Sequence, residues 1–203
     1  FQEGEASVDY AELKKVVPTM VRLLDRVLDT TYWPLEQQRQ EAMNKRRIGL
    51  GITGLGDALA MLGVRYDSEE GRALAGSIQR YITVEAYKAS VEMAREYGAF
   101  PLFSQEYLKS PFIQRLPKEV QEGIAKHGIR NSHLISIAPT GTISLAFGDN
   151  VSNGIEPAFA WHYNRKVRQD DGSWVDNRVE DYAFRLYREM FGEPDRLPAS
   201  FVS

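Results

Sequence analysis

The stretch from Ile129 to Ser144 constrains the fold more than any other part of the chain, because it joins an apolar segment to a small polar turn. Residues 133–138 have the composition of a buried strand, and Pro139 stops it. The turn Thr140-Gly141-Thr142 follows, and a helix is expected to start at Ser144. A strand that leads through such a turn into a helix leaves several backbone N–H groups without partners, all pointing one way.

A turn of this kind suits a phosphate, because the positive end of the helix dipole adds to the free N–H groups. Gly141 would let the backbone approach a ligand closely. Thr140, Thr142 and Ser144 can add hydroxyl donors. The turn alone leaves the alternative open, since many strand–helix connections contain Pro and Gly without binding anything.

Two motifs together carry a resemblance to a known family. The run from Ile129 to Ser144, followed by Gly154-Ile155-Glu156-Pro157, resembles the large catalytic subunit of ribonucleotide reductase. The Pro-Thr-Gly-Thr form of the turn is similar to the class II, adenosylcobalamin-dependent branch. Class I enzymes often carry other small polar residues in the turn, and a class I large subunit stays open. The similarity covers roughly residues 44–166.

The resemblance implies an α/β fold, part of a ten-stranded α/β barrel of the ribonucleotide reductase type. This helix-rich chain would be a carboxyl-proximal fragment of that barrel, with a β-hairpin near its carboxyl end. In the family the turn holds the substrate's phosphates through backbone amides and hydroxyls. The implied substrate-binding residues are Pro139, Thr140, Gly141, Thr142, Ile143 and Ser144.

The resemblance also implies a cytoplasmic enzyme that converts ribonucleotides, with diphosphates as the expected substrates, to 2′-deoxyribonucleotides by thiyl-radical chemistry. Adenosylcobalamin would be its cofactor. The expected partners are the ribonucleotide substrate and the rest of the same chain, and a homodimer is a further arrangement that the resemblance allows.

The chain contains no cysteine, which excludes a disulfide framework and a thiolate metal site. By the resemblance, the family uses one cysteine as a thiyl radical and a further pair as reductant, and none of these can lie in this chain. We therefore expect a fragment with no catalytic residue of its own, inactive alone.

Charge and composition exclude other classes. The net charge of −3 gives no reason to expect a nucleic-acid or anionic-membrane surface. No apolar run approaches the ~18 residues of a transmembrane helix. The three histidines show no metal-ligand spacing, so no metal site is expected.

Hydrophobic periodicity predicts the secondary structure. Helices are expected over residues 9–29, 34–45, 55–62, 68–97, 117–127 and 179–191, and strands over 47–54, 133–138 and 158–168. A hairpin is expected around Asp171-Gly172, with Trp174-Val175 on its return strand. We treat residues 1–203 as a single segment of a larger barrel domain, with a helical lead-in at 1–46, barrel strands and helices at 47–164, and a hairpin and helix at 165–203.

Two alternative functions come from other features. Gly49 to Gly54 fits the dinucleotide fingerprint G-x-G-x-x-G, which would indicate a Rossmann-type dehydrogenase domain. However, the polar segment from Asn44 to Arg47 precedes it, so the glycines fall inside the candidate strand, where close backbone packing explains them equally. The other alternative is a non-catalytic nucleotide-phosphate binding module that kept the fold and lost the thiols.

Several polar residues have a structural interpretation. We expect Asn131 and Ser132 to be structural, the run Lys45-Arg46-Arg47 to be a solvated helix end, and Asp57 to cap the helix beside it. Glu156 could face a pocket mouth, although local turn hydrogen bonding explains it as well.

Overall fold

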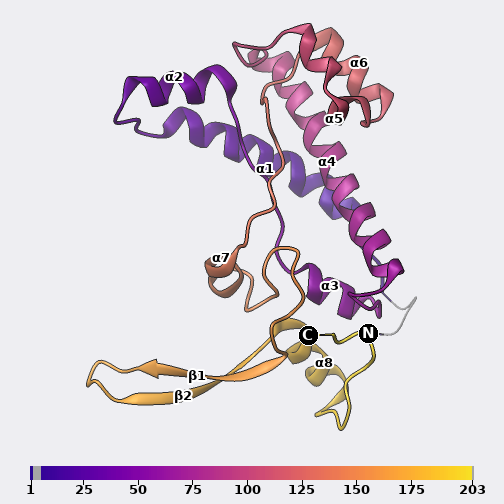
Figure 1. Ribbon diagram of the computed structural model, residues 1–203, viewed down its shortest axis with the longest axis vertical. Coiled ribbons are helices and arrows are strands. Elements are labelled where there is room, and N and C mark those ends of the chain that lie inside the picture. Colours follow the sequence, from indigo (N-terminus) through magenta and orange to yellow (C-terminus); the bar gives the residue numbers. More distant parts are fainter. Residues whose placement is uncertain (2–5, 203) are drawn as a thin grey trace. The chain divides into compact units, whose positions relative to one another are not determined.

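The computed structural model describes residue 1 and residues 6–202 (Figure 1). Its contacts divide the chain into two compact units. Unit 1 comprises Phe1–Val8, Ile52–Gly76 and Ile137–Ser203, and unit 2 comprises Asp9–Gly51 and Ser77–Ser136. Within the described residues, no helix combines the length and the apolar character needed to cross a bilayer.

Helices dominate both units. The α-helices are α1 (Tyr10–Thr30), α2 (Glu36–Lys45), α3 (Leu55–Met61), α4 (Glu69–Tyr97), α5 (Pro111–Gln114), α6 (Lys118–His127), α7 (Gly141–Ala146) and α8 (Tyr182–Phe191), with a 3₁₀ turn, η1, at Gln105–Lys109. The strands are β1 (His162–Arg168) and β2 (Trp174–Glu180).

Helix α1 starts where the sequence predicts, because the side chain of Asp9 accepts a hydrogen bond from the backbone N–H of Glu12 at 2.9 Å. Its buried face carries Val17, Val21 and Asp25, spaced four residues apart. Pro18 lies inside the helix without ending it. The Asp25 carboxylate on this otherwise apolar stripe requires a buried partner, and Arg46 of unit 2 is that partner.

Helix α4 also follows its prediction. The Ser68 hydroxyl accepts a hydrogen bond from the N–H of Gly71 at 2.9 Å, and Gly98, with φ +85°, ends the helix. Its expected apolar stripe is buried at Ile78, Ile82, Ala86, Ala89 and Met93, and half-buried at Leu74. Stripe and caps lie within one stretch of sequence, which is why they are predictable.

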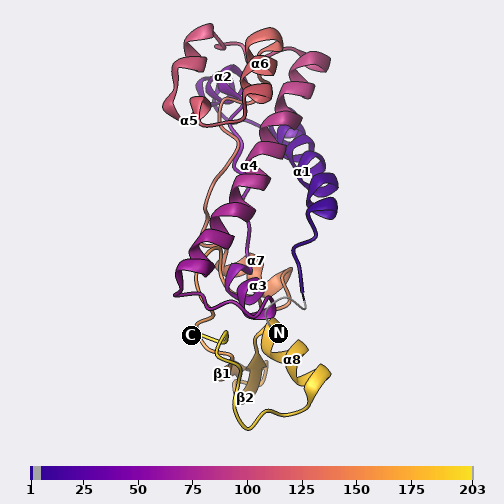
Figure 2. The same ribbon diagram turned by 90° about the vertical axis from the view of Figure 1, so that its right-hand side faces the viewer.

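Within unit 2, α5 and α6 pack beside α4 (Figure 2). The Phe112 and Tyr87 rings lie 5.6 Å apart between their centroids. A Cβ atom on Gly123 would come within 3.1 Å of Val91, so a small residue is needed where α6 meets α4.

The two predicted strands at 47–54 and 133–138 do not form. The segments run parallel and share one bridge, Leu50 with Ile135, in which the Leu50 N–H donates to Leu134 O at 2.7 Å and the Ser136 N–H donates to Leu50 O at 3.0 Å. A Cβ atom on Gly49 or Gly51 would lie 2.8 or 2.6 Å from Ser136 atoms. Close backbone packing therefore explains these glycines, as the second interpretation of the motif predicts.

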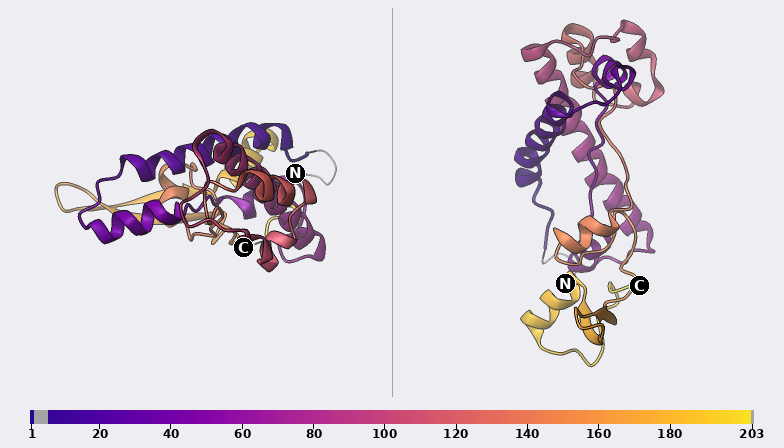
Figure 3. Two further views of the ribbon diagram at one scale, coloured as in Figure 1. Left: turned by 90° about the horizontal axis from the view of Figure 1, so that it is seen from above. Right: turned by 90° about the vertical axis from the view of Figure 1, so that its left-hand side faces the viewer.

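Unit 1 contains the hairpin and α8. Strands β1 and β2 pair antiparallel, with Tyr163 opposite Val179, around a turn where Gly172 has φ +85°. This β-hairpin extends away from α8 (Figures 1 and 3). The hairpin prediction is confirmed. The predicted helix start at 179 is wrong, because Val179 belongs to β2 and Asp181 caps α8 by accepting from the Ala183 N–H at 3.0 Å.

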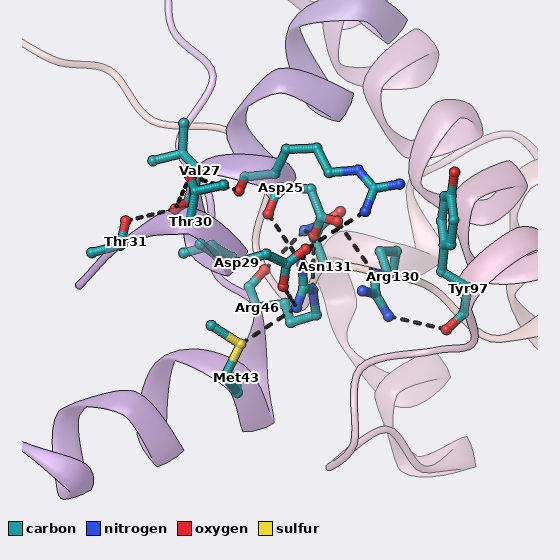
Figure 4. A network of polar contacts seen from close by, with 12 residues as sticks. Asp25, Val27, Asp29, Thr30, Thr31, Met43, Arg46, Tyr97, Arg130 and Asn131 are labelled. Carbon is teal, nitrogen blue, oxygen red and sulfur yellow. Dashed lines mark hydrogen bonds and ion pairs between the residues drawn. The ribbon is translucent and has the colours of Figure 1, made fainter. Parts of the chain in front are cut away.

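A buried polar network in unit 2 centres on Arg46 (Figure 4). Its Nε donates to Asp25 Oδ1 and its Nη1 to Asp29 Oδ1, both at 2.8 Å. The expectation of a solvated helix end is wrong for Arg46, which is 4% exposed with φ 43°, because the left-handed backbone turns its side chain onto α1.

The network also includes Asn131, which is fully buried. Its Nδ2 donates to Asp25 Oδ1 at 2.8 Å and to Arg46 O at 3.0 Å, and its Oδ1 accepts from the Ser90 hydroxyl at 2.9 Å. Its predicted structural role is confirmed. Burial alone would lower the pKa of Arg46, but hydrogen bonds to Asp25 and Asp29 outweigh burial and raise it. The hydrogen bond from Arg46 lowers the pKa of Asp29.

We predict that Arg46→Met lowers the free energy of unfolding by about 3–5 kcal/mol, because it leaves the buried Asp25 carboxylate without its main partner. Arg95→Met is the matched control, since within the described residues Arg95 pairs with the exposed Glu92 alone, and its loss should cost less than about 1 kcal/mol. Urea denaturation of the full-length protein measures both. Equal losses in the two variants would contradict a central role for the network.

Candidate functional site

The polar turn lies at the start of α7. The helix begins at Gly141, three residues before the predicted start at Ser144, because Thr140 adopts a left-handed conformation (φ 50°, ψ 22°) and turns the chain into the helix at once. The Ser144 N–H donates to Thr140 O at 2.9 Å and closes the first helical turn. Four of the six expected binding residues, Gly141 to Ser144, therefore form the first turn of a helix, and Pro139 and Thr140 precede it.

Two backbone segments hold Thr140 in place. Its hydroxyl accepts from the N–H of Gly154 at 2.6 Å and donates to the Thr53 hydroxyl at 3.0 Å. The Thr53 hydroxyl in turn donates to Ser152 O at 2.8 Å. A β-branched residue in the left-handed region costs roughly 1–2 kcal/mol and persists only where its surroundings fix it. Such strain is typical of functional turns.

Gly154 explains why the two sequence motifs occur together. Its φ is +49°, and a Cβ atom there would lie 2.6 Å from Ala138 O. The backbone of the second motif thus packs directly on the segment that leads into the polar turn. Only glycine fits this contact.

The hydroxyls of the turn differ in their surroundings. Ser144 is fully buried, and its hydroxyl lies 2.6 Å from Asn153 Oδ1, to which it donates. The Thr140 hydroxyl is engaged with Thr53 and Gly154. The Thr142 side chain is exposed. Among the three expected hydroxyls, two therefore shape the turn and Thr142 faces outward.

The first-turn amides of α7 are open. Among the described residues, no atom accepts a hydrogen bond from the N–H groups of Gly141, Thr142 or Ile143. All three residues are exposed, as is Pro139 before them. A Cβ atom on Gly141 would meet no other atom within 4 Å. This helix end can therefore donate three hydrogen bonds to an anion.

The amides at the end of the glycine-rich segment before α3 are hydrogen-bonded, unlike the open amides of α7. The N–H of Gly54 donates to Ser152 O at 2.8 Å, and that of Leu55 to Gly154 O at 3.5 Å. The Asp57 N–H donates to the Ser152 hydroxyl at 3.3 Å. Because the chain itself occupies these three amides at the start of α3, they are not available to the pyrophosphate of a dinucleotide, and the geometry does not support a Rossmann site.

A cavity of about 340 Å³ opens beside the turn. Its walls include Gly141, Asn153, Glu156, Tyr163 and Asp181. The placement of Glu156 agrees with the expectation that it faces a pocket. Its backbone N–H also donates to Asn153 O at 2.8 Å, so the local turn bonding that we weighed against a binding role is present as well.

Asp57 does not cap the helix beside it, which corrects our expectation. Its carboxylate accepts from the N–H of Ser152 at 2.8 Å and from that of Ala183 at 3.2 Å, and it is 2% exposed. Sequence reasoning missed its neighbour Asp181, although an aspartate before a helical pattern is a cap signal. Burial raises the pKa of Asp181 to about 8, and the charge of Asp57 adds to the rise.

Comparison with known proteins identifies the class of domain. Residues 1–189 match the family described as "Ribonucleotide reductase, barrel domain". The chain therefore belongs to the ribonucleotide reductase barrel-domain family. The predicted fold class, a helix-rich part of that barrel with a hairpin near the carboxyl end, is confirmed.

Individual relatives extend the comparison. A "Vitamin B12-dependent ribonucleoside-diphosphate reductase" of Mycobacterium tuberculosis is 39% identical over 81% of this chain and 21% of its own length. A protein of the same name from Thermoplasma acidophilum is 37% identical over 79% of this chain and 19% of its own. The "Ribonucleoside-diphosphate reductase subunit alpha" of Treponema pallidum is 33% identical over 76% and 19%. The chain thus spans about a fifth of the length of these relatives.

We predict that Thr53→Val loosens the turn, because it removes the hydroxyl that joins Thr140 to Ser152 and leaves the half-buried Thr140 hydroxyl without its acceptor, at a cost of about 1–3 kcal/mol. Hydrogen exchange at the amides of residues 140–154 in the full-length protein should become faster. Thr19→Val, which removes an exposed hydroxyl bonded only within its own helix, is the control. Unchanged exchange in Thr53→Val would contradict a role of the Thr53 and Thr140 hydroxyls in holding the turn.

Proposed function

We propose that this chain is the substrate-phosphate binding segment of a ribonucleoside-diphosphate reductase. The observation that carries the proposal is the set of three open amides at Gly141, Thr142 and Ile143, in the motif that the family resemblance assigns to phosphate binding. The three relatives are named ribonucleoside-diphosphate reductases, which supports a nucleoside diphosphate as the substrate.

Phosphate binding by this chain rests on backbone dipoles rather than on basic side chains. Among the described residues that line the cavity, none is lysine or arginine. Three first-turn N–H groups and the positive end of the α7 dipole favour an anion, and the exposed Thr142 hydroxyl can donate a further hydrogen bond. Because Thr140 is fixed on both sides, the amides are oriented before the ligand arrives.

The contribution of the segment to the reaction is position. Replacing the ribose 2′-hydroxyl with hydrogen by thiyl-radical chemistry requires cysteine sulfur, and this chain has no cysteine. Its part is to fix the phosphate end of the nucleotide, so that the ribose lies at the reactive sulfur supplied by the rest of the full-length protein. Holding the two reactants in one geometry converts a bimolecular encounter into an intramolecular step.

We place this enzyme in the adenosylcobalamin-dependent class. The Pro-Thr-Gly-Thr turn supports this, as does the higher identity to the two B12-dependent relatives, 39% and 37% against 33% for the Treponema subunit. The cavity beside the turn does not fit the cofactor itself, because a volume of about 340 Å³ is too small for a corrin macrocycle and its nucleotide tail. We therefore assign its contacts to other parts of the full-length protein.

We predict that Gly141→Val in the full-length enzyme weakens binding of a ribonucleoside diphosphate by about 10- to 100-fold, because the side chain covers amides that each contribute about 1.5–3 kcal/mol to a charged ligand. Isothermal titration calorimetry measures the change. The unfolding temperature should stay unchanged, since a Cβ atom on Gly141 meets nothing within 4 Å.

Gly76→Val is the matched control, because Gly76 also lies in a helix, with open space around its Cβ position, and lies outside the cavity wall. It should leave nucleotide affinity unchanged. Equal affinity in Gly141→Val and the parent enzyme would contradict phosphate binding at this turn.

A further inference from the structure

Two buried carboxyl groups meet at one backbone amide in unit 1. Asp57 Oδ2 and Asp181 Oδ1 both accept from the N–H of Ala183, at 3.2 and 3.0 Å. Asp57 is 2% exposed and Asp181 is 4% exposed. Atoms that share one donor at these distances lie close to each other, so the two carboxyl groups are buried neighbours.

The charged groups around the pair have other partners. On α8, Arg185 pairs with Asp149 and Arg188 pairs with Glu180. From β1, the His162 ring packs against the Phe184 ring at a tilt of 49°, with 5.4 Å between ring centroids. Among the described residues, no lysine, arginine or histidine forms an ion pair with Asp57 or Asp181.

The cavity side adds no positive charge either. Glu156 and the Tyr163 hydroxyl are the titratable groups that line the cavity together with Asp181. Two adjacent buried carboxylates without a cation cannot both stay ionised, so one must hold a proton. Asp57 accepts from the N–H groups of Ser152 and Ala183, and Asp181 also accepts from that of Ala183, so the two carboxyl groups are held against each other by the same backbone.

We propose that Asp57 and Asp181 share a single proton, which joins α3 to the start of α8 and fixes the cavity wall beside Gly141, and that Asp181 is thereby a positioning residue for the nucleotide. The statement about the nucleotide rests on the proposed function, and the shared proton does not. Asp57 also holds the Ser152 N–H at 2.8 Å, and Ser152 lines the cavity, so the pair connects two parts of one wall.

The pH dependence follows from the pair. Burial, followed by the charge and hydrogen bond of Asp57, raises the pKa of Asp181 to about 8, whereas an aspartate in an unfolded chain has a pKa of about 3.9. Between these values the folded protein holds a proton that the unfolded chain has lost. Stability should therefore fall as the pH rises from about 4 to about 8 and level off above that. Loss of the proton above about 8 places two like charges together and opens the wall.

The test uses Asp181→Asn in the full-length enzyme, because an asparagine can accept from the Ala183 N–H and donate to Asp57, as the protonated acid does. Infrared difference spectroscopy should show a protonated carboxylic acid at pH 7 in the parent enzyme, titrating near pH 8, and its absence in the variant. Calorimetry should show diphosphate affinity falling in the parent above that pH, by up to about tenfold per pH unit for one linked proton, and a flatter profile in the variant.

Asp171→Asn, in the exposed hairpin turn, is the control and should keep the parental band and profile. If Asp181→Asn does not fold, Asp57→Asn serves instead, since removing the neighbouring charge should shift the Asp181 band to lower pH. A parental band that survives in Asp181→Asn, or does not move in Asp57→Asn, overturns the shared proton.

Suppose that the infrared band behaves as expected but that the diphosphate affinity of the parent enzyme does not change with pH. That result overturns the positioning role of Asp181. If instead Gly141→Val leaves affinity unchanged, the proposed function fails, while the infrared band and the stability profile still decide whether the proton is shared.

Discussion

The site depends on one strained residue. Thr140 lies in a backbone conformation that a β-branched side chain avoids, and the hydroxyl of Thr53 and the N–H of Gly154 hold it there. This conformation starts α7 at Gly141 and leaves the amides of Gly141, Thr142 and Ile143 open. The energy stored in the turn is offset by hydrogen bonds to segments far away in the sequence, so the geometry of the turn is a property of unit 1 as a whole.

Most helices could be predicted from the sequence, because their determinants are local. The Asp9 cap, the Gly98 stop and the apolar stripes lie within a few residues of the elements they define. The predicted strands at 47–54 and 133–138 failed for the opposite reason. Strands become regular through neighbours on both sides, and among the described residues these two segments share one β-bridge, Leu50 with Ile135.

The phosphate turn could be proposed from its motif, but its supports could not. From the sequence, Arg46 is predicted to be part of a solvated basic run, because its partner Asp25 lies 21 residues away. The position of Asp25 on the buried stripe of α1 is the signal that would have indicated a partner. Asp57 and Asp181 are 124 positions apart in the numbering, and no sequence pattern joins them. Residues whose role depends on distant partners need the folded structure.

The most direct measurement is a crystal structure of the full-length enzyme with a ribonucleoside diphosphate bound. The account predicts phosphate oxygens about 2.7–3.2 Å from the amide nitrogens of Gly141, Thr142 and Ile143, with Thr140 still in its left-handed conformation. Phosphates bound elsewhere, with these amides hydrogen-bonded to another part of the protein, would contradict it.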